Sequence, residues 1–370
     1  MNRAVHAAAA EQGRVRGVDD GVDRLLRDVA LDGCDIRHDV TLAPLRLHLP
    51  GLPTSWHRSQ TNPIVKAQTN GPRVRGARGP LAQSGANMPT RDLIERVRKA
   101  LGDRYTVITA VGRGGNACIF GAYDQAGQKV AIKVLHPELA VSVAADRFLR
   151  EIRYASQLDH PHIARLLDSG ETDYLLWFAM PYLPGETLRQ VLRREARLAV
   201  DRAARAGCEI LDALGHAHQH GIAHRDIKPD NIVLSPTGAV LVDLGIARAI
   251  ATSGDDRVTR SGFVVGTEEY MSPEQAAGSP DVDGRTDLYS LGIVLFESLA
   301  GRPPFSSVSA AAVLDMHQHE KAPDIRILRR DIPKPLSLVL ARALAKTRDE
   351  RWQTATEMRE ELLPFTQPVA

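Results

Sequence analysis

The chain has 370 residues, 43% of them hydrophobic, and a formal net charge of +2. Such a length and composition are typical of a soluble globular protein with a substantial core, and the near balance of charges gives no reason to expect nucleic acid or a membrane surface as a specific partner. Its three cysteines are too far apart for a disulfide framework or a paired zinc motif, and no run of about 18 apolar residues occurs, so we expect a cytoplasmic protein without a membrane span.

The first part of the chain, residues 1–87, mixes Arg, Gly, Pro, Asp and His with little periodicity, and prolines interrupt any longer element. We expect a mostly disordered tail. Two alternatives stay open: a regulatory or nucleic-acid-binding tail, or a segment outside the native protein, with translation starting at Met88. Apolar residues then recur at helical spacing from Leu93 to Leu101, which predicts a helix within residues 88–104 that leads into the folded domain.

The period of the sequence changes to two at Tyr105, which indicates a sheet. β-forming segments are predicted at residues 105–115, 117–124, 128–135, 163–170 and 174–182. Residues 142–160 carry an apolar helical stripe and precede Pro161, so a helix separates the third strand from the fourth.

Beyond Gly185 the pattern is mainly helical. Helices are predicted at residues 201–221, 286–301, 336–346 and 354–363, and two short strands at residues 231–235 and 239–245. A small β-rich lobe is therefore followed by a larger helical lobe.

Five motifs follow one another along this pattern. They are "GRGGNACIFG" at 112–121, "VAIK" at 130–133, "HRDIKPDN" at 224–231, "DLG" at 243–245 and "SPE" at 272–274. In this order they resemble the motif set of the protein kinase family, from about residue 105 to about residue 365.

The resemblance implies an α+β fold, the two-lobed protein kinase fold, with one main helix in the β-rich lobe. Its expected parts are an N-lobe at 105–180, a hinge at 181–185, a C-lobe at 186–365 and a tail at 366–370. It also implies the activity of a bacterial, eukaryotic-like Ser/Thr kinase, which transfers the γ-phosphate of ATP to serine and threonine hydroxyls of proteins.

Catalytic roles carry over by position in the motifs. Lys133 is expected to hold the α- and β-phosphates, with Glu151 as the carboxylate that orients it. Asp226 matches the aspartate that accepts or orients the proton of the substrate hydroxyl. Lys228 is expected to neutralise the γ-phosphate, and its presence marks the Ser/Thr class rather than the tyrosine class.

The resemblance also implies a metal site. Asn231 and Asp243 are expected to ligate Mg²⁺, for which Mn²⁺ is a substitute, because these hard cations prefer oxygen ligands. Leu244 stands where the family commonly has the phenylalanine of Asp-Phe-Gly. Both residues are apolar, so Asp243 is still expected to reach the metal.

Further residues are expected to bind ATP. They are Gly112, Arg113, Gly114, Gly115, Ala117 and Ile119 in the glycine loop, with Ala131, Met180, Pro181 and Leu183 around the adenine. Ala117 stands at the place of the third glycine of G-x-G-x-x-G, so either its methyl group raises the KM for ATP or the substitution is silent.

A regulatory segment and three structural residues complete the resemblance. Thr259 and Ser261 are the candidate autophosphorylation sites, and Thr267 is expected to contact the substrate beside the acceptor. The structural residues are Glu274 and Arg351, expected as a buried ion pair, and Asp287, expected to brace the catalytic loop.

Alternatives to an active kinase come from other classes. A pseudokinase that signals by conformation would be favoured by loss of Lys133, Asp226 or Asp243, and all three are present. A third reading makes the tail at residues 1–87 the functional part. Partners are expected to be protein substrates with Ser or Thr, and homodimerisation for autophosphorylation in trans is left open.

Overall fold

The computed structural model describes residues 90–114, 117–136, 145–243 and 268–367, with side chains for all of these except 90, 91, 145–148 and 151. The expectations for residues 1–87, the tail alternatives included, lie outside the described residues.

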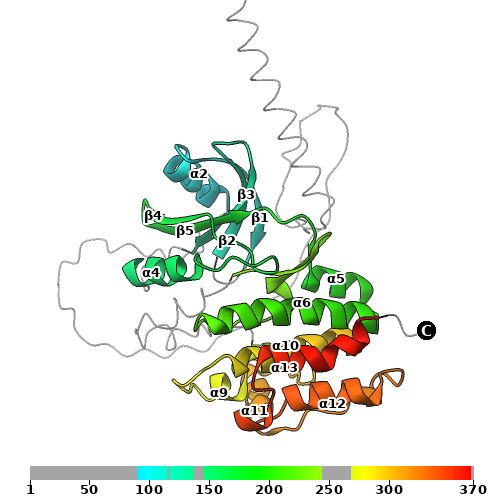
Figure 1. The fold of residues 1–370 in the computed structure, drawn as a ribbon. Helices are drawn as coiled ribbons and strands as arrows, with labels where there is room; N and C mark the ends of the chain where they lie inside the picture. Colours follow the sequence, from blue (N-terminus) through cyan, green and yellow to red (C-terminus); the bar gives the residue numbers. More distant parts are fainter. Residues whose placement is uncertain (1–89, 115–116, 137–144, 244–267, 368–370) are drawn as a thin grey trace, which may run out of the picture. The chain divides into compact units, whose positions relative to one another are not determined.

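The first described element is helix α2, Thr90–Leu101 (Figure 1). Leu93, Val97 and Leu101 recur every four residues and are at most 3% exposed, while the neighbouring Lys99 faces solvent. This apolar stripe packs α2 against the strand that follows, because hydrophobic residues at that spacing share one helix face.

A five-stranded antiparallel sheet follows α2 and forms the N-lobe. Its strands are β1 (Tyr105–Arg113), β2 (Ala117–Asp124), β3 (Lys129–Leu135), β4 (Asp168–Thr172) and β5 (Leu175–Pro181), in the order β1-β2-β3-β5-β4. Helix α4, Ala145–Ala155, lies beside this sheet (Figure 1).

Two predicted boundaries in this lobe are wrong. β4 begins at Asp168 rather than at Ile163, because Ile163 instead forms an isolated parallel bridge with Leu241 of the C-lobe. Helix α4 ends at Ala155, five residues before the predicted end. The hydroxyl of Ser156 donates to the carbonyl of Arg153 at 2.7 Å, and such side-chain bonding competes with a further helical turn.

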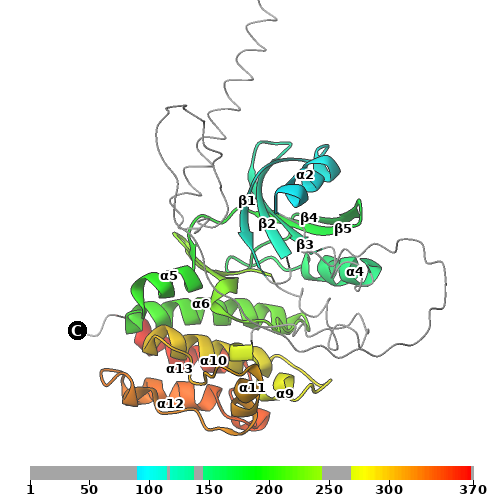
Figure 2. The ribbon, with the colours of Figure 1, turned by 180° about the vertical axis from the view of Figure 1, so that it is seen from behind.

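Helices dominate the C-lobe (Figure 2). Its α-helices and β-strands are β6 (Glu186–Thr187), α5 (Leu188–Glu195), α6 (Val200–Gln219), β7 (Ile232–Ser235), β8 (Gly238–Leu241), α9 (Pro273–Ala276), α10 (Arg285–Ala300), α11 (Ala310–His319), α12 (Lys334–Ala343) and α13 (Ala355–Leu362). Short 3₁₀ helices lie at η1 (Pro229–Asn231), η2 (Glu268–Tyr270), η3 (Ile325–Ile327), η4 (Arg348–Glu350) and η5 (Leu363–Thr366). Together the sheet and this helical lobe confirm the predicted α+β, two-lobed fold class.

Helix α10 is the centre of the C-lobe. All of its residues from Thr286 to Leu299 are buried, so it is covered on every side, as a helix inside a core must be. Gly207 of α6 allows the close packing around α10, because a Cβ there would lie 2.9 Å from a methyl of Leu295 and 2.7 Å from one of Leu362.

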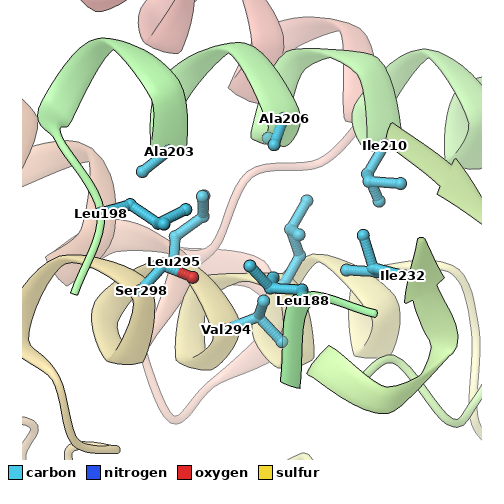
Figure 3. Close-up of a pocket in the computed structure, with 11 residues that line it drawn as sticks. Leu188, Leu198, Ala203, Ala206, Ile210, Ile232, Val294, Leu295 and Ser298 are labelled. Atoms are coloured by element: carbon cyan, nitrogen blue, oxygen red, sulfur yellow. The ribbon is translucent and has the colours of Figure 1, made fainter. Parts of the chain in front are cut away.

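Between α6 and α10 lies a cavity of about 10 Å³ (Figure 3). Its lining is apolar apart from Ser298 of α10, whose side chain points toward it. Within the described residues the buried hydroxyl of Ser298 has no hydrogen-bond partner. A space of this size with one polar group does not hold a water molecule, which needs two or more partners.

The variant Ser298→Ala is therefore expected to be more stable than the wild type. It removes a buried hydroxyl that costs about 1 kcal/mol or more when unpaired, and alanine is also the better helix former. Thermal unfolding is expected to show a Tm about 2–4 °C higher. The matched control is Ser290→Ala in the same helix, which is expected to lower the Tm because the Ser290 hydroxyl donates to the carbonyl of Tyr270 at 2.7 Å. A lower Tm for Ser298→Ala would show that the Ser298 hydroxyl does make a stabilising hydrogen bond.

No helix in the described part of the chain has both the length and the apolar character that spanning a bilayer requires.

Candidate active site

The loop between α6 and β7 carries the "HRDIKPDN" motif, and the N-terminal turn of α10 holds its backbone. The buried carboxylate of Asp287 accepts hydrogen bonds from the amide of His224 at 2.8 Å and the amide of Arg225 at 2.7 Å. Arg225 has a φ of 66°, a left-handed value that costs a non-glycine residue about 1–3 kcal/mol and persists only where surrounding contacts offset that cost. Asp287 therefore holds this loop in a strained conformation.

A histidine from α6 holds Asp287 itself. The Nε2 atom of His218 lies 2.8 Å from a carboxylate oxygen of Asp287. Burial alone would raise the pKa of Asp287, but the hydrogen bond from His218, the charges of His218 and His224 and the amide of Arg225 keep this pKa below its usual value. The carboxylate is thus stabilised in its charged form, in which it accepts both loop amides.

Three side chains converge within the loop. The Nδ2 amide of Asn231 donates to the carbonyl of Asp226 at 2.8 Å and to its carboxylate at 3.0 Å. The ammonium of Lys228 lies 2.8 Å from the same carboxylate. Asp226 is thus held in one orientation, with a cation beside it and its side chain still 22% exposed to solvent.

The N-lobe adds Lys133 to this group. Lys133 lies on β3 between its strand partners Ile119 of β2 and Phe178 of β5. Its Nζ atom is 2.5 Å from a carboxylate oxygen of Asp243. The residue before Asp243 is bonded to the "HRDIKPDN" loop, because the amide of Val242 donates to the carbonyl of Asn231 at 3.0 Å. Asp243 therefore lies between this loop and Lys133 of β3.

Asp243 has two unusual features. Its φ is 66°, again in the left-handed region. Its second carboxylate oxygen, Oδ1, is buried and has no hydrogen-bond partner among the described residues. An unpaired buried carboxylate oxygen is costly, so each such atom in a native structure calls for an explanation, and the binding of a cation is one.

The glycine loop joins β1 to β2. The amide of Gly114 donates to the carbonyl of Ala117 at 2.9 Å and closes the described part of the loop. A Cβ at Gly112 would meet only Ile119, at 4.0 Å, and one at Gly114 only the carbonyl of Ala117, at 3.7 Å. These are ordinary contact distances and neither glycine has a positive φ, so the described fold itself has room for side chains here.

Comparison with known proteins decides which family uses this arrangement. The family described as Protein kinase domain matches residues 105–363, well over half of the chain. The chain belongs to the protein kinase family. This result confirms the resemblance inferred from the five motifs.

Individual relatives are similarly informative. The serine/threonine-protein kinase PknB of Mycolicibacterium smegmatis and that of Mycobacterium tuberculosis are each 42% identical over 270 residues, which are 71% of this chain and 43% of each relative. A probable serine/threonine-protein kinase of Streptomyces coelicolor is 40% identical over 272 residues, 71% of this chain and 40% of the relative. The chain spans less than half the length of these curated relatives.

Several residues predicted for this kinase site lie outside the described residues. Glu151 belongs to α4, but its side chain is not described, so its pairing with Lys133 stays a prediction. Gly115, Leu244 and the segment with Thr259, Ser261 and Thr267 are also outside.

The methyl group of Ala117 lies in the core of the kinase N-lobe. Ala117 is the first residue of β2, is 2% exposed, and belongs to a cluster of buried residues with Leu135, Phe178 and Met180. Its φ is not positive, so alanine adopts this conformation without strain. Alanine in place of the third glycine of the motif therefore adds a methyl group to the core of the lobe.

Replacing this alanine by the family's glycine is expected to lower the stability of the fold without changing the binding of ATP. The variant Ala117→Gly should leave the KM for ATP within about twofold of the wild type and lower the stability by about 1 kcal/mol, because it removes a buried methyl and frees the unfolded chain. ATP titration and thermal unfolding measure the two effects. A KM that falls severalfold would instead show that the methyl hinders nucleotide binding.

The predicted hinge, residues 181–185, begins at the last residue of β5. Met180 is 7% exposed and pairs with Ala131 of β3, while Pro181 pairs with Val130. After Pro181 the chain leaves the sheet, and Leu183 is partly buried on the way to β6. Ala131 and Met180, two of the predicted adenine contacts, are therefore direct neighbours across two strands.

The C-lobe contains the predicted buried ion pair. Arg351 is 0% exposed and donates to both carboxylate oxygens of Glu274, at 2.8 and 2.9 Å. The hydroxyl of Thr286 donates to the same carboxylate at 2.5 Å. Burial would raise the pKa of Glu274, but the hydrogen bonds from Arg351 and Thr286 lower it below its usual value.

Two residues that hold the loop with the "HRDIKPDN" motif were not predicted from the sequence. His218 supports Asp287, and the side-chain amide of Gln275 donates to the carbonyl of Arg225 at 2.8 Å. The signal for Gln275 was present: Ser272 and Gln275 have the spacing of a capping box, which α9 indeed forms. His218 carries no local signal, because its partner is 69 residues away in sequence.

Proposed function

We propose that the chain is an active serine/threonine protein kinase that transfers the γ-phosphate of ATP to protein hydroxyls with Mg²⁺ as cofactor. The observation that carries the proposal is the convergence of Asp226, Lys228 and Asn231 on a loop whose strained backbone is braced by Asp287. Phosphoryl transfer depends mainly on positioning and charge neutralisation, and this arrangement supplies both.

The proposed nucleophile is a serine or threonine hydroxyl bound at Asp226. The carboxylate, fixed by Asn231, orients this hydroxyl and takes its proton as the oxygen–phosphorus bond forms and the bond between the γ-phosphorus and the β–γ bridging oxygen breaks, with ADP as the leaving group. The ammonium of Lys228 lies beside the same carboxylate and stabilises negative charge on the transferred phosphoryl group. Lysine at this position and the names of the relatives favour serine and threonine over tyrosine.

Two protein oxygens are suited to a magnesium ion. The buried Oδ1 of Asp243, which has no hydrogen-bond partner in the described part of the chain, is one. The side-chain carbonyl of Asn231 is the other, since its amide nitrogen is already used by Asp226. The described residues hold no cluster of three His, Cys, Asp or Glu side chains that would bind a metal unaided, which fits a cation shared with nucleotide phosphates. When bound, the ion would neutralise phosphate charge.

The proposed ATP site lies under the glycine loop. Because the described fold has room for side chains at Gly112 and Gly114, the close approach of phosphates to the backbone is the physical reason for glycine there. Lys133 is proposed to hold the α- and β-phosphates. Its contact with Asp243 keeps its ammonium next to the proposed metal ligand. Autophosphorylation at Thr259 or Ser261 is part of the proposal.

The test is incubation of the purified chain with Mg-ATP and a general protein substrate, followed by phosphosite mapping. Phosphoserine and phosphothreonine are expected, and removal of divalent cations should abolish their formation. Nucleotide binding without any phosphate transfer would instead indicate a pseudokinase, and phosphotyrosine as the main product would overturn the assigned acceptor.

A further inference from the structure

Helix α2 lies outside the part of the chain that matches the kinase family. The match begins at residue 105, and α2 ends at Leu101. Nevertheless Leu93 and Val97 are almost completely buried against the N-lobe. An element that buries its apolar face in this way belongs to the folded lobe, so its effect on the neighbouring strands can be derived from its contacts.

One arginine of α2 is bonded to the backbone of β1. The Nε atom of Arg98 donates to the carbonyl of Val107 at 3.0 Å, and its Nη2 atom donates to the carbonyl of Ile108 at 2.6 Å. The planar guanidinium can make two such bonds at once and thereby fixes the orientation of both carbonyls.

The two carbonyls belong to an irregular point of the strand. Val107 pairs with Ala122 of β2 and Thr109 pairs with Gly121, so Ile108 is an additional residue in β1. Such a β-bulge disrupts the ladder locally and bends the strand. β1 is an edge strand of the described sheet, so no further strand donates hydrogen bonds to its outer side. Arg98 supplies two donors to carbonyls of this strand instead.

A second arginine ties α2 to the opposite edge of the sheet. The guanidinium of Arg96 donates to the carbonyl of Asp173 at 3.0 Å, in the turn between β4 and β5. This turn is tight, with positive φ values of 52° at Asp173 and 58° at Tyr174. Both ribbon views place α2 beside the sheet, between β1 and this turn (Figures 1 and 2). The helix thus connects the two edge strands, β1 and β4.

The bulge lies four residues before the glycine loop. From Ile108 the strand continues to Gly112, with a second register shift between Ala110 and Gly112. The position of the loop therefore depends on where β1 is anchored, and Arg98 is a side-chain anchor at its bend. We infer that Arg98 is a positioning residue for the phosphate-binding loop. Through Arg98, helix α2 fixes β1 and so helps to set the geometry of the nucleotide site. This inference depends on the proposed function of the loop in binding ATP.

The test compares Arg98→Met with Lys99→Met. Methionine keeps an unbranched apolar side chain but donates no hydrogen bond, and Lys99 is an exposed neighbour on the same helix. In Arg98→Met we expect the KM for ATP to rise about five- to tenfold while kcat stays within about twofold, and in Lys99→Met no change. Arg98→Lys, which can donate to one carbonyl at a time, should lie between Arg98→Met and the wild type.

Amide hydrogen exchange gives a second readout that does not need activity. In the free protein, Arg98→Met should speed exchange of the amides from residue 109 to residue 114, with little change in α6 and α10. A variant whose KM and exchange equal those of the wild type would overturn the inference, as would a loss of kcat that follows a general loss of folded protein. If the wild type itself binds no ATP, the proposed function fails, and hydrogen exchange still decides whether Arg98 positions the loop.

Discussion

Asp226→Asn is expected to lower kcat by about 10²- to 10⁴-fold while the KM for ATP stays within about twofold. Asparagine has nearly the same shape as aspartate but cannot accept the proton of the attacking hydroxyl. It also has no charge to pair with Lys228, whose ammonium lies 2.8 Å from the carboxylate in the wild type. The described contacts of Asp226 are within its own loop, so ATP binding should be little affected.

The measurement is steady-state phosphorylation of a peptide with varied ATP, together with the Tm of each protein. Asp159→Asn serves as the matched control, because Asp159 is exposed and lies outside the loop. It should keep wild-type kcat. Equal phosphate incorporation by wild type and Asp226→Asn would overturn the proposed mechanism, and a large fall in Tm would mean that the variant reports on folding rather than chemistry.

Local patterns in the sequence were enough to predict the sheet and the motif loops. The alternation of β-forming residues predicted β1, β2, β3 and β5, because each of these strands carries its pattern within a few residues. The predicted fourth strand overlaps β4 only at residues 168–170, because β4 has the sequence DSGET and lacks such a pattern. Helices α5 and α11 were missed. Helix α5 has only eight residues, and α11 begins with three alanines and buries only Val313 and His317, so its apolar stripe is weak.

Contacts between distant parts of the chain could not be predicted in the same way. Nothing near His218 indicates a bond to Asp287, and nothing near Arg98 indicates a bulge in β1. The resemblance to kinases led us to expect that Glu274 and Arg351 lie together, as they do, because a family motif carries information about three-dimensional neighbours that a single sequence lacks. The predicted roles of the catalytic and ATP-binding residues stay predictions. The resemblance carries no information about α2, which precedes the matched residues; the helix predicted within residues 88–104 came from the spacing of its apolar residues alone.

Arg351→Met is expected to destabilise the protein by about 3–5 kcal/mol and to lower its Tm by about 10 °C, although the residue is remote in sequence from the catalytic loop. The substitution leaves the carboxylate of Glu274 buried without its cation, and it also removes donors to the carbonyls of Ala345 and Lys346. Loss of kinase activity in this variant should therefore follow the loss of folded protein.

Two further variants separate the ion pair from other effects. Arg348→Met removes a nearby, partly exposed arginine that pairs with Asp281 and Asp283, and it should cost less than about 1 kcal/mol, because ion pairs open to solvent contribute little to stability. The double variant Arg351→Met with Glu274→Met should recover a substantial part of the loss, since no unpaired charge remains. A double variant no more stable than Arg351→Met would show that the two carbonyls, rather than the carboxylate, account for the effect.

The pH dependence of unfolding tests the same carboxylate directly. In the wild type the pKa of Glu274 is below its ordinary value of 4.5, so its contribution to stability is present above that value and is lost as the pH falls through the lower folded pKa. In Arg351→Met the cation is gone, burial raises the pKa, and the folded variant takes up a proton at a pH where the wild type does not. Urea unfolding should therefore show a larger difference between the two proteins at neutral pH than near pH 5. A difference that is equal at both pH values would mean that Glu274 stays charged in the variant, and the loss of stability would then have to come from the carbonyls that Arg351 leaves unpaired.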